Sequence, residues 1–258
     1  MRGLLWIIAF LIGVVGVVMP GVYFYYSTKL PPLESEFDLE KLLRGYIEGE
    51  RTSQRVGSED LRKLSSVWPR PDFQGLPRDL VALYISSQGC PSFFQTPREG
   101  TTKAGMRAFR NYLLHQGTDG VNGRCELKMG SHLTNGIRIY GDWEQGIAAL
   151  RIRNFLSKDQ LVAYDLTSIN FEDGVFGVED ASRVLFAKPL AQLTLAQQAE
   201  LMLALLPESF YSDLKVCRAP IVLKQWRDAL LEKLARDALV PPDRAKRAEE
   251  DVLGCTRG

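Results

Sequence analysis

The sequence predicts a mainly α-helical protein, in which one N-terminal transmembrane helix precedes a single helical domain. The first observation behind this prediction is an uncharged and strongly apolar run from Gly3 to Tyr26. The second is that apolar residues recur at spacings of three and four along most of the remaining chain. Alternating, strand-like patterns are few, and Val216–Val222, for example, is broken by Pro220.

The bulk composition excludes some classes of function. The 258 residues suit one membrane anchor and one domain of about 200 residues. The formal net charge of +1 argues against nucleic acid as a main partner, because phosphate binding needs an excess of Lys and Arg. The two histidines, His115 and His132, have no metal-ligand neighbour at a useful spacing, so no metal site is expected.

The apolar run Gly3–Tyr26 is expected to be a membrane anchor. At about 1.5 Å per residue it spans the roughly 30 Å hydrocarbon layer with some tilt. It is long for a signal peptide and lacks a small-x-small cleavage site. Tyr23, Tyr25 and Tyr26 then form an aromatic belt at its outer end. A cleaved signal peptide and a buried helix are the alternatives.

Charges and cysteines bear on the orientation of this anchor. Arg2 precedes it and Lys29 follows it, which favours a cytoplasmic N-terminus only slightly. Four cysteines without C-x-x-C spacing fit two disulfides in an oxidising compartment better than a metal site. Four buried free thiols are the alternative. The cysteines are Cys90, Cys125, Cys217 and Cys255.

The remaining chain is expected to divide into a linker and a helical domain. The predicted boundaries are 1–29 for the anchor, 30–70 for a juxtamembrane linker and 71–258 for the domain. Whether the linker packs on the domain or only tethers it is left open. Apolar spacing predicts helices over 37–44, from Pro77 onward, and over 104–115, 142–156, 158–168, 177–187, 193–206 and 220–239. Thr194 is the expected N-cap of one of them, with Gln197 completing a capping box.

The stretch from Phe155 to Phe210 resembles the second half of a family 51 peptidoglycan glycosyltransferase domain. The chain reads LSKDQL at 156–161, GVEDASR at 177–183 and LTLA at 193–196, where the family typically reads LSKDEI, GVExAAR and LTLA. The likeness is fainter upstream, at Leu76–Val81 and Arg107–Leu113.

This resemblance implies both a fold and a cellular setting. Enzymes of the family polymerise lipid II into glycan strands on a mostly helical, lysozyme-like fold. It implies that the N-terminus lies on the inner side of the cytoplasmic (inner) membrane of a bacterium, and that the domain lies on the outer side, in the periplasm. The implied partners are membrane lipid, lipid II or peptidoglycan glycan, and other cell-wall synthesis proteins. A cofactor is not certain, although a divalent cation of the family type fits.

The first catalytic motif of the family, EDxxFxxH, is degenerate here. Its Glu is the general base that takes the proton from the acceptor sugar hydroxyl. Counting without gaps from Leu80 places Gln88 at this position and Gly89 at the Asp that follows it. Glutamine has nearly the shape of glutamate but accepts no proton. Glu99 is a candidate replacement base, with a solvated loop carboxylate as the alternative interpretation.

The other motifs are retained only in part. The second, GxSTITQQ, falls by spacing on Gly123–Met129, where only the glycine matches, and a placement at 130–134 lies too close to the third motif. The third keeps an acid, Glu144, without its paired cations. The fourth and fifth keep Lys158 and Arg183, and the resemblance implies that these two and Arg107 bind substrate. Ordinary surface cations are the equal alternative for Lys158 and Arg183.

The resemblance also implies a disulfide. Cys90 and Cys125 replace residues of the two motifs that face each other across the cleft of the family. We therefore expect them to bridge the boundary between acceptor and donor sites. Cys217 is then left to pair with Cys255 and to hold the C-terminal tail.

Together these losses predict a membrane-anchored glycosyltransferase-like protein that is catalytically impaired. Base and phosphate-binding cations act together, so losing them should remove many orders of magnitude in rate. A divergent active transglycosylase that uses Glu144, Glu99 or Asp142 is an alternative. A lysozyme-like hydrolase with Glu144 beside Trp143 as its acid is another. A helical interaction module without a ligand is the third.

Overall fold

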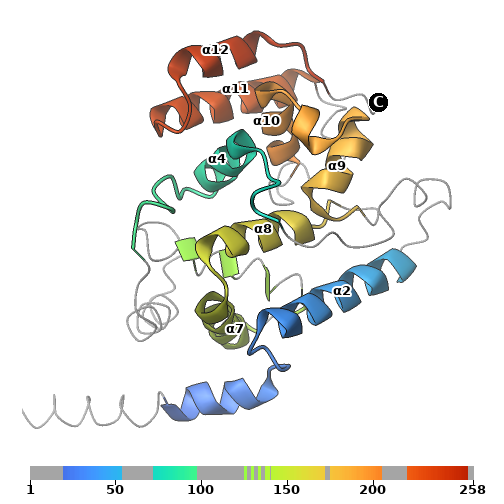
Figure 1. The fold of residues 1–258 in the computed structure, drawn as a ribbon, viewed down its shortest axis with the longest axis vertical. Helices are drawn as coiled ribbons and strands as arrows, with labels where there is room; N and C mark the ends of the chain where they lie inside the picture. The colour runs from blue at the N-terminus through green and yellow to red at the C-terminus, as the bar shows by residue number, and fades with distance from the viewer. Residues whose placement is uncertain are drawn as a thin grey trace, which may run out of the picture.

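The chain is mainly helical, as the sequence predicts. The computed structural model describes residues 20–53, 72–97, 125–126, 129–130, 133–134, 137–139, 141–171, 175–204 and 220–254. In these residues the β pairing consists of a single isolated bridge, between Asn170 and Phe176. Figure 1 shows the helices stacked along the long axis of the molecule, with α8 (Lys158–Ser168) near the middle.

The larger of two hydrophobic cores lies in the C-terminal half and is called the C-terminal core. At its centre is α10 (Leu195–Leu203), every residue of which is buried. The expected capping box is confirmed: Thr194 accepts from the backbone N–H of Gln197, whose side chain accepts from that of Thr194. The helices around it are α4 (Arg78–Ser87), α9 (Gly177–Phe186), α11 (Pro220–Arg236) and α12 (Pro242–Glu250), with the short 3-10 helix η1 (Leu190–Gln192).

A buried ion pair closes this core beneath the C-terminal tail. Arg227 and Glu200 are almost entirely inaccessible to solvent, with 3.3 Å between Nη1 and Oε1. Arg227 also donates to the backbone carbonyls of Glu249 and Asp251, each at 2.9 Å. The backbone N–H of Gly254 donates to Glu200 Oε2 at 3.0 Å. The pair therefore docks residues 251–254 against α10 and α11.

The second, N-terminal core joins α2 (Glu36–Ser53) to α7 (Asp142–Phe155) and α8. Leu39, Leu43 and Ile47 recur every four residues on α2, so they share one face, and all three are fully buried. Burying each such side chain contributes about 1.5–3 kcal/mol. Tyr164 of α8 donates to Glu36 at 2.8 Å and to Glu40 at 3.0 Å. Residues 33–51 of the predicted linker therefore pack on the domain.

The helix at 20–29 lies at the N-terminal end of this stack (Figure 1). Arg151 of α7 donates to Ser27 Oγ at 2.8 Å, which connects this helix to the N-terminal core. Tyr23, Phe24 and Tyr25 are exposed on it. In the part of the chain that the structure describes, no helix has the length and apolar character needed to cross a bilayer. Most of the predicted anchor lies outside that part.

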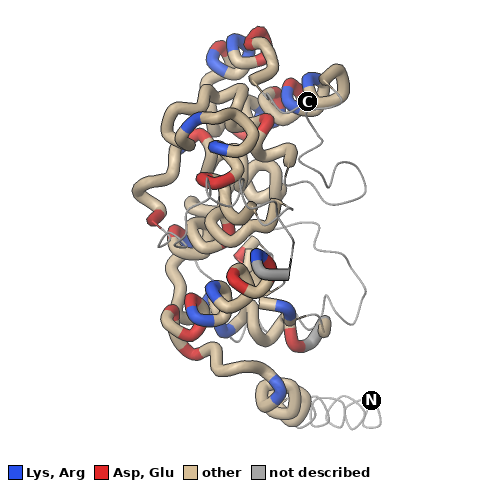
Figure 2. Tube along the Cα trace, turned by 90° about the vertical axis from the view of Figure 1, so that its right-hand side faces the viewer, with Lys and Arg blue, Asp and Glu red and all other residues tan. Residues whose placement is uncertain are grey.

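Sequence-predicted helix positions agree closely with the structure. Residues 158–168 form α8 as expected, and the helix expected over 177–187 is α9. Those expected over 142–156 and 220–239 are α7 and α11. The helix at 104–115 lies outside the described residues. Acidic and basic residues are interspersed along the chain trace (Figure 2), in keeping with the small net charge.

Candidate functional site

The candidate site is built on the turn that ends α4. Gln88 is the C-cap of this helix, and Gly89 follows with a φ of 71°, which favours glycine. Gly89 N–H donates to the carbonyl of Ser86 at 2.9 Å, and Cys90 N–H donates to that of Ile85 at 2.8 Å. These two bonds form a Schellman motif, which satisfies the last carbonyls of the helix. The turn places Gln88 at the helix end and directs the chain into the loop 88–97.

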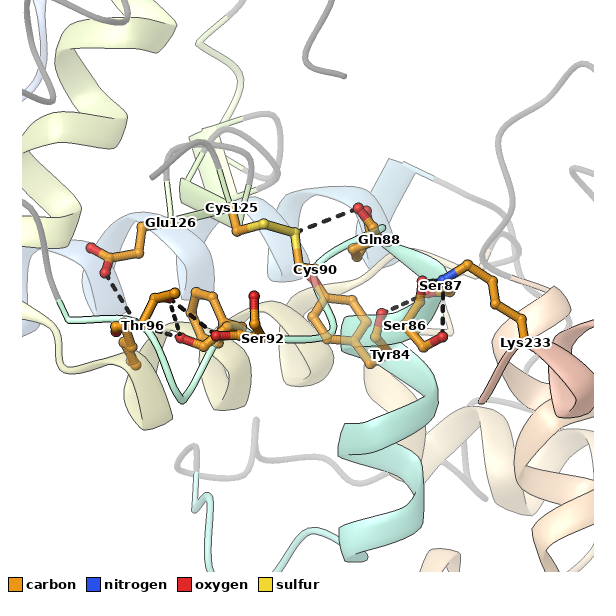
Figure 3. Close-up of a disulfide and its surroundings, with 12 residues drawn as sticks. Tyr84, Ser86, Ser87, Gln88, Cys90, Ser92, Thr96, Cys125, Glu126 and Lys233 are labelled. Atoms are coloured by element: carbon orange, nitrogen blue, oxygen red, sulfur yellow. Dashed lines mark hydrogen bonds and ion pairs between the residues drawn. A yellow bond between two sulfur atoms is a disulfide. The ribbon is translucent and has the colours of Figure 1, made fainter. Parts of the chain in front are cut away.

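The expected disulfide between Cys90 and Cys125 is present. The two Cα atoms are 5.9 Å apart, and both residues are buried in the C-terminal core. The bond therefore ties the loop 88–97 to the helical residues 125–126 (Figure 3). The second expected pair, Cys217 and Cys255, lies outside the described residues.

A buried charged cluster lies next to this disulfide. Glu126, directly after Cys125, accepts from Arg153 Nε at 3.0 Å and lies 2.9 Å from its Nη2. The Lys158 ammonium is 3.7 Å from the other carboxylate oxygen of Glu126. The Arg153 and Glu126 side chains are only 3% and 5% exposed. Glu126 and Gln88 lie on opposite sides of the disulfide (Figure 3), so Glu126 does not occupy the position of Gln88.

Lys158 also binds the backbone of the loop 88–97. Its Nζ donates to the carbonyls of Phe93 and, at 2.5 Å, Thr96, and it lies 4.8 Å from the centre of the Phe93 ring. A capping box made by Ser157 and Gln160 begins α8 at this lysine. The ammonium therefore faces inward and holds the loop against the start of α8.

The end of α4 is held from its other side by α11. Lys233 Nζ donates to the backbone carbonyl of Ser86 at 2.5 Å and to Asp237 at 2.9 Å. Ser86 Oγ donates to the same carboxylate at 2.6 Å. Burial raises the pKa of Asp237, but the hydrogen bonds from Ser86 and Lys233 outweigh it, so the pKa lies below its ordinary value. Figure 3 shows this contact beside Gln88.

Glu144 lies in the first turn of α7 and is half-buried. Its carboxylate folds back over Gly141, in the space that a side chain there would occupy, and it interacts electrostatically with Lys29. Nine residues of helix separate it from Arg153, which corresponds to about 13 Å along the axis of α7. Glu144 therefore lies at the opposite end of α7 from Arg153, which is the member of the Glu126 cluster on this helix.

Arg183 lies on the surface of α9. Its side chain is 45% exposed and pairs with Glu179 at 2.8 Å and with Asp180 at 3.8 Å. Asp180 also pairs with Arg51 of α2 at 3.1 Å. Arg183 is therefore the exposed member of an ion-pair network that includes the buried Asp180. Arg107, Glu99 and the side chains of Asp142 and Trp143 lie outside the described part of the structure.

Comparison with known proteins shows what this chain is similar to. Residues 131–234 match the family model described as transglycosylase. The penicillin-binding protein 1A of Rickettsia conorii is 26% identical over 240 residues, which cover 90% of this chain and 29% of that protein. That of Pseudomonas aeruginosa is 25% identical over 242 residues, 92% of this chain and 28% of that protein. These similarities support a divergent family 51 transglycosylase domain in this chain. It spans less than a third of the length of these relatives.

The transglycosylase match and the departures from it fall in different parts of the chain. The matched residues run from just before α7 to the end portion of α11 and contain Glu144, Lys158 and Arg183. Gln88, Cys90 and the cysteine that bridges to it precede the match. The part that the family model matches therefore includes α7 to α10 and most of α11, and the turn at Gln88 and the disulfide precede it.

Sequence reasoning did not single out two buried acids that make contacts in this region, Glu126 and Asp165. Glu126 falls in the degenerate second motif, and the one signal that could have marked it is the neighbouring cysteine, which is expected to form a disulfide. Asp165 lies on α8. It is buried and accepts a hydrogen bond from Tyr84, which joins α8 to α4, and burial raises the pKa of the Tyr84 hydroxyl.

A surface pocket of about 490 Å³ lies beside the start of α8. Apolar side chains form most of its wall, with one cation and one anion. It is lined by Phe73, Gln74, Leu76, Arg78, Val81, Phe94 and Asp159.

Among the described residues, no three His, Cys, Asp or Glu side chains lie together in a way that could hold a metal ion. These described residues therefore offer no such group of ligands for a divalent cation.

Proposed function

We propose that this chain is a membrane-anchored, peptidoglycan glycosyltransferase-like protein of cell-wall synthesis that does not polymerise glycan efficiently. Its role is then to bind lipid II or glycan, or to serve as a scaffold for other cell-wall synthesis proteins. The apolar run Gly3–Tyr26 and the exposed aromatic residues at 23–25 support the anchor. The anchor in turn supports a domain on the periplasmic side of the inner membrane.

The observation that carries the proposal is Gln88 at the C-cap of α4. The family resemblance assigns the general base to this position, and an amide cannot accept the proton. Proton transfer by a positioned base typically contributes 10²–10⁴-fold to a rate. The turn leads within two residues into the buried disulfide at Cys90, so the loop has little freedom to bring in another base from its own length.

The neighbouring carboxylates support the same conclusion. Glu126 faces Arg153 and Lys158 rather than a free space where a sugar hydroxyl could be bound. Glu144 lies at the far end of α7, close to Lys29. Asp165 is buried against Tyr84. The partners described for these three acids are Arg153 and Lys158, Lys29, and Tyr84.

A polymerisation assay tests the proposal. The detergent-purified full chain is incubated with fluorescent lipid II and a divalent cation, and the products are separated on a gel. Lipid II binding is measured in parallel. We expect no glycan chains from the wild type. Polymer formed by the wild type but not by Glu144→Gln would identify an active enzyme with Glu144 in its mechanism and would overturn the proposal.

A Gln88→Glu variant serves as the matched control. It changes one amide to the carboxylate that the family carries and leaves the size of the side chain unchanged. Because the other motifs have also changed, we expect at most a small gain in polymer. A fully active Gln88→Glu enzyme would instead mean that the loss of the base is the only defect.

A further inference from the structure

The pocket beside the start of α8 also adjoins the start of α4, and it lies apart from the turn at Gln88. Arg78, which lines the pocket, is the first residue of α4, and Gln88 follows the last one. About 15 Å of helix therefore separates the two along the axis of α4. The volume of about 490 Å³ is in the range of pockets that hold a small ligand. The pocket is thus a second concave surface, distinct from the end of α4.

Aromatic rings form the apolar part of its wall. Phe94 packs edge-on against Phe73, with 5.7 Å between the ring centres, and against the buried Phe93, at 5.0 Å. The Phe94 side of this cluster is open, since the residue is 39% exposed. An apolar side chain that enters the pocket would cover these rings and remove their surface from water, which favours binding.

The wall is held in place before any ligand arrives. The loop 88–97, which carries Phe94, is tied down by the disulfide at Cys90 and by the Lys158 ammonium, which donates to two of its carbonyls. The turn before α4 is closed by the backbone N–H of Leu76, which donates to the carbonyl of Phe73 at 3.2 Å. A preformed wall lowers the entropy cost of ordering the site on binding.

The pocket also carries two side chains of opposite charge, Arg78 in the first turn of α4 and Asp159 in the first turn of α8. Both are exposed, and in the part of the chain that the structure describes neither makes a hydrogen bond or an ion pair. A guanidinium binds a carboxylate through parallel hydrogen bonds, and a carboxylate accepts from an ammonium group. A ligand with one group of each kind would satisfy both side chains.

We propose that this pocket binds a short peptide with a free carboxylate and a free ammonium group. The carboxylate pairs with Arg78, the ammonium group pairs with Asp159, and an apolar side chain between them covers Phe94. The amide of Gln74, which also lines the pocket, can donate to and accept from the peptide backbone. A neutral sugar would fit the aromatic wall but would leave both charges without a counterion. The observations therefore favour the peptide.

This use of the pocket deepens the proposed function and rests on it for the source of the ligand, which is the peptide part of peptidoglycan. The pocket would then hold the peptide while the glycan to which it is attached lies outside. Binding in the pocket requires neither a general base nor glycan polymerisation, so it is compatible with Gln88 at the end of α4.

A synthetic tripeptide tests the proposal. Alanyl-phenylalanyl-alanine with one fluorine on its ring is titrated into the full chain in detergent, and the affinity is measured by fluorine NMR. We expect the free peptide to bind about tenfold more tightly than its N-acetylated or C-amidated form, because each blocked form lacks one charge-assisted hydrogen bond. Equal binding of free and doubly blocked peptides would indicate a segment inside a longer protein chain and would overturn the proposal. Failure of all the peptides to bind at millimolar concentration would also overturn it.

Two variants assign each end of the peptide to one side chain. Arg78→Gln should bind the free and amidated peptides equally while still preferring a free ammonium group, and Asp159→Asn should show the reverse. Both side chains are exposed and without a described partner, so the variants should fold. Retention of both preferences in both variants would overturn the proposal.

Matched controls make the same changes of charge on α12. Asp243 is exposed in the first turn of this helix, as Asp159 is in that of α8, and Arg247 is an exposed arginine. Asp243→Asn and Arg247→Gln should bind every form of the peptide as the wild type does. The same loss of preference in these controls would mean that net charge alone attracts the peptide and would overturn the proposal.

Competition decides the source of the ligand. The bound tripeptide is challenged with a soluble fragment of peptidoglycan that carries its peptide, and with the same glycan without the peptide. Displacement by the first alone supports the proposal. Displacement by the bare glycan would mean that the pocket binds sugar, and no displacement by either would overturn the link to peptidoglycan. Glycan polymer made by the wild type would contradict the proposed function and would leave these binding results unchanged.

Discussion

The disulfide between Cys90 and Cys125 allows a quantitative prediction of stability. The perturbation is Cys90→Ala/Cys125→Ala, made in a chain in which Cys217 and Cys255 are already alanine. This background leaves one disulfide to test. The variant removes the covalent connection between the loop 88–97 and the helical residues at 125–126.

The expected loss follows from the chain entropy of the unfolded state. The two cysteines are 35 residues apart in the sequence. A cross-link that closes a loop of this length lowers the entropy of the unfolded chain and so stabilises the folded state by about 4 kcal/mol. That is a large part of the total stability expected for a domain, about 5–15 kcal/mol.

Urea unfolding of the full chain in detergent measures this difference. The oxidised background protein is compared with the same protein after reduction, because the reduced form keeps both sulfur atoms in the core. The difference between their free energies of unfolding isolates the contribution of the cross-link. A further loss of stability in the alanine variant reports the packing of the two sulfur atoms. A difference below about 1 kcal/mol between the oxidised and reduced forms would refute the reasoning, since the cross-link would then not constrain the unfolded chain.

Three further predictions follow from the packing. Leu43→Ala on α2 should cost about 2–5 kcal/mol in urea unfolding, whereas Phe37→Ala, at a position that is 73% exposed, should change the stability by about 0.5 kcal/mol or less. Glu200→Gln should cost about 3–5 kcal/mol and increase proteolysis of the C-terminal tail, because it removes the buried anion of Arg227 and leaves it only the partly exposed Asp228; a tail as resistant as that of the wild type would contradict this. The lowered pKa of Asp237 means that its stabilisation is present above its unfolded pKa of about 4 and is lost as the pH falls through the folded pKa. Asp237→Asn should therefore be less sensitive to acid than the wild type in unfolding measured between pH 6 and 3, and unchanged sensitivity would exclude this role.

Much of the helical scaffold could be predicted from local pattern. The apolar period of α8 and the capping residues of α10 are short-range features, since each depends on residues within one or two turns. The same holds for the end of α4, where a glycine allows the left-handed turn. By contrast, α12 was not expected, because its nine residues carry a weak apolar pattern and only Ala245 and Ala248 are buried.

The candidate site could be predicted only where a sequence motif or a cysteine marked it. Gln88 and the Cys90–Cys125 pair came from comparison with the family motif, and the structure contains the disulfide. The resemblance implies that Lys158 binds substrate, with an ordinary surface cation as the alternative, and the structure places its ammonium beside two backbone carbonyls and Glu126. The direction of a long, flexible side chain depends on what packs around it, which its position in a motif does not specify.

The sequence by itself determined the helical class and the position of most helices, and its resemblance to the family predicts that Gln88 replaces the base. Only the tertiary structure decided that α2 packs on the domain, that Glu144 lies apart from the charged cluster, and that Glu126 neutralises Arg153 and Lys158. The physical reason is the range of the interactions. Helix periods and caps are set by near neighbours in the chain, whereas ion pairs between distant residues depend on how the helices pack, and packing is a property of the whole fold.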